Sequence, residues 1–124
     1  MSASNMFSAG EFSGIKTIMC IEKCLTIIRD DDVIKFISSI MKDLHSLEEV
    51  YYDEDRRDLL LEMRKTVRSK IDGLRINNRN SYALRLLELC VLMHIDSVNG
   101  HDKRLKSKLL QFDTAFRKFD YKYL

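Results

Sequence analysis

Two pairs of side chains with metal-binding chemistry are spaced four residues apart in this sequence. Cys20 precedes Cys24, and Cys90 precedes His94. An i, i+4 pair lies on one face of an α-helix, so two such pairs on facing helices hold the ligands of a tetrahedral Cys₃His zinc site. Free cysteines also commonly serve as small buried hydrophobes. We adopt this second interpretation, and we therefore predict neither a metal nor a cofactor.

The familiar catalytic motifs are missing from the sequence. It contains no glycine-rich phosphate loop, no nucleophile elbow and no histidine–glutamate zinc motif. The acidic pairs Glu48–Glu49 and Asp53–Asp55 could be cast as acid–base groups, but nothing in the sequence indicates a cleft around them. We expect them to be helix-end acids, and the sequence predicts a protein that is not an enzyme.

Charge is distributed unevenly along the chain. Residues 1–52 carry five basic and eight acidic side chains, whereas residues 101–124 carry seven basic and three acidic ones. The net charge of +2 argues against a dedicated nucleic-acid coat. One interpretation is that the basic side chains of residues 101–124 form a solvated helix face. The alternative is a strip that binds an acidic partner or phosphate, formed by Lys103, Arg104, Lys106, Lys108, Arg117 and Lys118.

Cysteine count and hydropathy indicate the cellular compartment. The three cysteines are an odd number, and no basic-then-apolar leader precedes them, so a secreted disulfide scaffold is not predicted. The longest strongly apolar run, Leu86–Met93, is far too short to span a bilayer. We expect an intracellular protein, cytoplasmic or nuclear, that does not bind membranes.

Apolar residues recur at three- and four-residue steps, which predicts helices that would position these side chains. A single compact all-α bundle of about five helices is expected over residues 14–124, after a flexible arm at residues 1–13. The absence of proline favours uninterrupted helices. We place the helices at residues 14–29, 33–47, 53–74, 81–99 and 102–121.

Helix ends carry recognisable capping residues. Asp30, the first of three consecutive acids, is expected to cap the second helix, and Ser81 the fourth. Asn99-Gly100 tolerates the left-handed conformation that ends a helix. The fourth helix is apolar on nearly every side from Leu86 to Met93, which predicts that it lies at the centre of the bundle.

The last two predicted helices resemble the corresponding helices of BAG-domain co-chaperones. The resemblance runs from Asn80-Ser81-Tyr82 to Ile95-Asp96-Ser97-Val98 and on to the basic run at residues 102–108. In that family these helices bind the nucleotide-binding domain of Hsp70 and open it, and Asp96 matches an acidic residue used in that contact. The places of the family's arginine and glutamine hold Ser107 and Thr114 or Ala115. The resemblance implies a chaperone regulator.

Part of the fourth helix, from Tyr82 to Asn99, also resembles one helix of the pneumovirus antitermination protein core, which binds RNA and phosphoprotein. Two functions are therefore carried forward. The leading one is a non-enzymatic protein–protein interaction module, an adaptor with Hsp70-type chaperones among its expected partners. The alternative is a small regulatory nucleic-acid-binding or viral host-modulating protein that uses the basic C-terminal helix. A homo-oligomer is compatible with either function.

Overall fold

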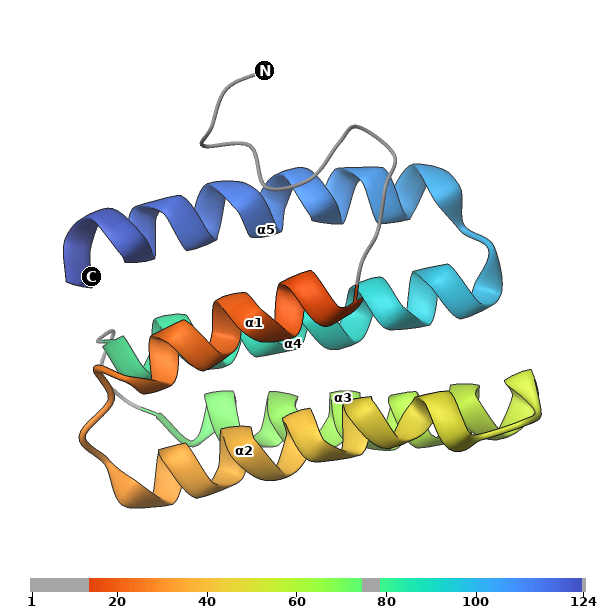
Figure 1. The fold of residues 1–124 in the computed structure, drawn as a ribbon, viewed down its shortest axis with the longest axis horizontal. Helices are drawn as coiled ribbons and strands as arrows, with labels where there is room; N and C mark the ends of the chain where they lie inside the picture. The colour runs from red at the N-terminus through yellow and green to blue at the C-terminus, as the bar shows by residue number, and fades with distance from the viewer. Residues whose placement is uncertain (1–13, 75–78, 124) are drawn as a thin grey trace.

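A computed structural model of the chain describes residues 14–74 and 79–123, and within these ranges it is all-α (Figure 1). The elements are α1 (Gly14–Leu25), α2 (Asp31–Ser46), the short 3₁₀ turn η1 (Leu47–Glu49), α3 (Asp53–Asp72), α4 (Arg79–Asn99) and α5 (Asp102–Tyr123). The predicted all-helical class is confirmed. The predicted arm at residues 1–13 lies outside the described residues.

Helix α4 is the central element of the bundle. It contacts α3, α5, α1 and α2 (Figure 1). Its fully buried apolar residues lie on several faces of the helix, because packed neighbours cover most of its circumference; they are Ala83, Leu84, Leu86, Leu87, Cys90, Val91 and Met93. The prediction of a central apolar fourth helix is confirmed. No helix in the part of the chain that the structure describes has both the length and the apolar character needed to cross a bilayer.

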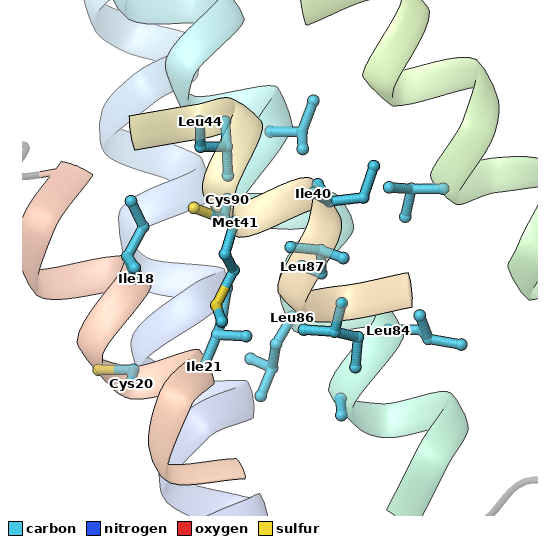
Figure 2. Packing of buried hydrophobic residues seen from close by; sticks show 14 of the residues in the cluster. Ile18, Cys20, Ile21, Ile40, Met41, Leu44, Leu84, Leu86, Leu87 and Cys90 are labelled. Atoms are coloured by element: carbon cyan, nitrogen blue, oxygen red, sulfur yellow. The ribbon is translucent and has the colours of Figure 1, made fainter. Parts of the chain in front are cut away.

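All five α-helices contribute to one hydrophobic core, and Figure 2 shows the part of it where α1, α2 and α4 meet. Ile18 and Ile21 of α1 extend towards Met41 of α2 and towards Leu86 and Leu87 of α4 (Figure 2). All five side chains are buried. Burying an aliphatic side chain of this size stabilises a fold by roughly 1.5–3 kcal/mol relative to leaving it exposed. This junction therefore fixes α1 and α2 against the central helix.

The connection between α1 and α2 differs from the expected one. Helix α1 ends at Leu25, four residues before Arg29, and Thr26 and Ile27 close a turn by donating to the carbonyls of Lys23 and Cys24. Asp30 caps α2 as predicted, because its Oδ1 accepts hydrogen bonds from the backbone N–H groups of Asp32 and Val33 at 3.0 and 3.3 Å. An N-cap residue must be extended, so the chain leaves the helix before Asp30.

The prediction that Ser81 caps α4 is wrong. The helix already begins at Arg79, and Ser81 lies within it with 3% of its surface exposed. The Arg79 guanidinium donates through Nη1 to the carbonyl of Ile27 at 3.2 Å and lies 5.7 Å from the ring centroid of Tyr123. These contacts connect the start of α4 to the end of α1 and to α5.

Candidate functional site

The turn between α4 and α5 follows the Schellman pattern that glycine makes accessible. Gly100 has φ +71°, a left-handed conformation, and its N–H donates to the carbonyl of Ser97 at 3.2 Å. The N–H of His101 donates to the carbonyl of Asp96 at 2.9 Å. The predicted stop at Asn99-Gly100 is confirmed. This tight turn makes α4 and α5 an antiparallel hairpin and fixes the register between them.

Asp96 and Lys108, both predicted partner-binding residues, contact each other across this hairpin. Lys108 Nζ donates to Asp96 Oδ2, and His101 Nδ1 lies 3.8 Å from Asp96 Oδ1. Asp96 has 4% of its surface exposed, and Lys108 is half-buried. A buried carboxylate is costly unless it is paired, so this ion pair gives both residues a role in holding α4 against α5. Contact of Asp96 with a partner protein stays a prediction.

The remaining predicted cations also lie on α5. Arg117 Nη2 donates to Asp113 Oδ2 at 2.5 Å, and Asp113 lies on the edge that faces Cys20 of α1. Lys118 lies on the opposite edge, beside α4. Lys103, Arg104 and Lys106 are exposed near the start of the helix. All five cations are exposed on α5, three of them near its start and two in its second half.

A groove runs between the first half of α4 and the second half of α5. Its volume is about 640 Å³. The floor is apolar, and the ionisable groups along its walls include three cations and no carboxylate. The lining residues are Tyr82, Arg85, Leu86, Leu110, Gln111, Thr114, Ala115, Lys118, Phe119, Lys122 and Tyr123. We call this feature the α4–α5 groove and take it as the candidate site.

Leu110 is the most exposed aliphatic residue of the groove, with 71% of its surface accessible. It was missed in the sequence because it lies off the apolar stripe of α5, which passes through its buried neighbour Leu109. Arg85 and Lys122 were also missed. The available signal for Leu110 was an apolar side chain on the polar face of an amphipathic helix, a position that core packing does not require.

Aromatic rings hold the lysine at one end of the groove. Lys122 Nζ lies 5.5 Å from the ring centroid of Tyr82 and 5.3 Å from that of Tyr123. Contacts of this kind are cation–π interactions, which are worth roughly 0.5–1 kcal/mol at exposed sites. They place the ammonium group at the mouth of the groove, where it adds to the positive charge of Lys118.

The residues of the considered zinc site are not assembled. Among the described residues, no three or more His, Cys, Asp or Glu side chains form a group that could hold a metal ion. Cys90 Sγ lies 3.3 Å from Thr17 Oγ1, and His94 Nδ1 lies 2.7 Å from the carbonyl oxygen of Cys90. The sulfur atoms of Cys20 and Cys90 lie apart in the core (Figure 2).

Burial determines the chemistry of these thiols and of the imidazole. Desolvation raises the pKa of Cys20 to about 11 and the pKa values of Cys24 and Cys90 to about 12. At neutral pH they are therefore thiols, which are poor nucleophiles and poor metal ligands. Burial lowers the pKa of His94, opposed by its hydrogen bond to the Cys90 carbonyl. A Cβ on Gly14 would lie 2.8 Å from His94 Nε2, so any other residue at position 14 would require this ring to shift.

The fold and the groove together define an all-α bundle in which a central helix and the C-terminal helix form a hairpin with an apolar, cation-lined groove. Comparisons of the chain with protein-family models, with curated proteins and with solved structures found no match.

Proposed function

We propose that this chain is a non-enzymatic interaction module that receives a partner protein on its α4–α5 hairpin. The observation that carries the proposal is the α4–α5 groove, in which Leu110 is exposed beside the apolar floor. Isolated apolar side chains are common on protein surfaces, but an apolar groove bordered by polar groups is typical of binding sites. The raised pKa values of Cys20, Cys24 and Cys90 disfavour nucleophilic catalysis by these three thiols.

A photo-crosslinking residue in place of Leu110 tests this proposal. We expect discrete covalent adducts with another protein in the cells that express the chain, because the crosslinker would lie inside the interface. The matched control places the same crosslinker at Leu61 of α3, which is 44% exposed and lies outside the groove. Adducts at position 61 alone, or at neither position, would refute the proposal. An adduct of twice the chain's mass would identify the partner as a second copy.

The specific form of the module is a regulator of an Hsp70-type chaperone. It is supported by the resemblance of the α4–α5 segment to BAG-domain helices and by the helical hairpin that this segment forms. Because Asp96 is buried, chaperone contacts would come mainly from the exposed Lys103 and Arg104. We expect the purified chain to retain the Hsp70 nucleotide-binding domain in a pull-down and to accelerate its nucleotide release. If neither occurs, the chaperone form is refuted while the interaction module is not.

The second candidate is a small regulatory or viral host-modulating protein that binds nucleic acid through α5. The observation in its favour is that four cations are exposed and form no ion pair with any described residue; they are Lys103, Arg104, Lys106 and Lys118. Such binding would weaken steeply with salt, because each phosphate contact releases counterions. Salt-dependent binding of a 20-nucleotide RNA that is lost when the four cations are neutralised would support it. Absent or salt-independent binding would exclude it.

A further inference from the structure

We propose that the partner segment in the α4–α5 groove is an amphipathic, acidic helix of another protein. Its apolar side chains would lie on the groove floor, and its carboxylates would contact Lys118 and Lys122. This inference rests on the proposed function, since it names the chemistry of the partner that the same surface receives.

The shape of the groove fits a helix with leucine-sized side chains. Two antiparallel helices form its walls, and its floor includes Leu86 and Phe119, both almost fully buried. Leu110 and Ala115 extend this apolar surface along α5. A third helix packs against such a pair by placing residues at i, i+3, i+4 and i+7 into the groove between them. Helix α1 already packs against α4 of this hairpin. It leaves the groove open, because its Cys20 lies near Asp113, on the edge of α5 away from the groove.

The charge of the groove selects an acidic occupant. Lys118 and Lys122 are four residues apart, so they lie on one face of α5, and Arg85 adds a positive charge on the α4 wall. The lining residues include no Asp or Glu. An occupant with carboxylates beside its apolar residues would form charge-assisted contacts here, whereas a basic one would face like charges. The complementary segment is therefore both apolar and acidic.

The arrangement of the groove favours a protein over a nucleic acid. Nucleic acids require cations spaced along a backbone track, and affinity grows with each phosphate that is neutralised. Two cations that would extend such a track on α5, Lys108 and Arg117, are paired with Asp96 and Asp113. An apolar floor contributes nothing to phosphate binding, but it buries the apolar face of a helix.

A random library of displayed 16-residue peptides, selected on the full chain, tests the inference. We expect enriched peptides to carry a net negative charge and apolar residues at three- and four-residue spacing. A labelled peptide from this set should lose at least about tenfold in affinity on Leu110→Ser and on Lys118→Glu with Lys122→Glu, as expected for central interface residues.

Matched controls come from α3. Leu59→Ser removes a leucine that is 46% exposed, and Arg64→Glu with Lys65→Glu makes the same change in net charge on exposed residues. Both variants should keep peptide affinity within about twofold, and circular dichroism should show that every variant is folded. Because the substituted side chains are all largely exposed, we expect changes in stability within about 0.5 kcal/mol.

Three results would overturn the inference. They are failure to enrich any peptide, enrichment of basic or uncharged peptides, and binding that Leu110→Ser leaves unchanged. A 20-nucleotide RNA that displaces the labelled peptide, with an affinity insensitive to Leu110→Ser, would assign the surface to nucleic acid instead.

The crosslinking experiment distinguishes this inference from the proposed function. If crosslinked proteins appear at position 110 but no acidic peptide is enriched, the interaction module stands and the acidic helix is refuted. If crosslinks are also absent, both are refuted.

Discussion

The α4–α5 groove and the groove between α2 and α3 have similar construction and opposite charge. The second groove has a volume of about 440 Å³ and an apolar lining that includes Phe36, Ile40, Leu59 and Met63. Its charged lining residues are Asp43 and Glu62, both acidic. Pairs of helices thus leave apolar grooves on two parts of this bundle, and the side chains at their edges distinguish them. The two grooves therefore differ in the charge at their edges and not in their apolar character.

The α4–α5 hairpin and the α2–α3 groove also differ in the surroundings of their acidic residues. Asp96 is buried and paired with Lys108, whereas Asp43 is exposed and has no ion pair among the described residues. We expect Asp96→Ala to lower the free energy of unfolding by about 2–4 kcal/mol, because it leaves the half-buried ammonium of Lys108 without its partner. Asp43→Ala should change it by less than about 0.5 kcal/mol. Urea denaturation measures both, and equal effects would contradict a structural role for the pair.

The turn of the α4–α5 hairpin provides the next largest effect. Gly100→Ala should lower the free energy of unfolding by about 1 kcal/mol, because a Cβ disfavours the left-handed backbone. The added methyl meets no atom within 4 Å, so the cost is purely conformational. Gly73→Ala at the end of α3 is the control, since Gly73 has φ −76° and a Cβ would make ordinary contacts there. A destabilised Gly73→Ala with an unaffected Gly100→Ala would reverse this assignment.

A smaller effect is expected in the pH dependence of the free energy of unfolding, because it involves one proton on the ring of His94. Burial lowers the pKa of His94 in the folded chain, so the unfolded chain binds the proton more readily. Stability is then complete above the ordinary pKa of 6.5 and falls as the pH decreases below it. His94→Gln should remove this part of the acid dependence, and His45→Gln on an exposed part of α2 should not. Urea midpoints between pH 7.5 and 5 measure the slope. Equal slopes for the His94→Gln variant and the unmodified chain would contradict the prediction.

The smallest effect is expected from substitutions in the groove between α2 and α3. Asp43→Lys with Glu62→Lys raises the net charge by four but leaves the α4–α5 groove intact. We expect the affinity for the selected acidic peptide to stay within about twofold at physiological salt, where charges farther apart than about 8 Å are largely screened. A clear gain in fluorescence anisotropy titrations would mean that net charge, and not the groove, attracts the peptide.

Helix positions could be predicted from the sequence because apolar spacing and capping residues are local signals. The stripe from Leu105 to Phe119, the cap at Asp30 and the stop at Gly100 each depend on residues within a few positions of one another. The start of α4 could not be predicted in this way. Its first residue, Arg79, donates to the carbonyl of Ile27, a contact between residues 52 positions apart that local spacing does not reveal.

The candidate site was only partly accessible to sequence reasoning. Lys118 was among the predicted cations, but its grouping with Arg85 and Lys122 depends on the register of α4 against α5. The turn at Gly100 sets that register. The same register pairs Lys108 with Asp96, two residues that the sequence indicated as separate partner contacts. Periodicity assigns a residue to a face of its own helix, but it does not say which neighbouring helix covers that face.

The position of α4 between its neighbours in the chain has a consequence for folding kinetics. Its most extensive contacts are with α3 and α5, the helices directly before and after it. Bundles dominated by such local contacts fold in microseconds to milliseconds, because little loop entropy is lost before contacts form. Contacts of α1 with α4, such as that of Thr17 with Cys90, join residues 73 positions apart. We expect α3, α4 and α5 to assemble first and α1 to dock last, so that substitutions in α1 mainly accelerate unfolding.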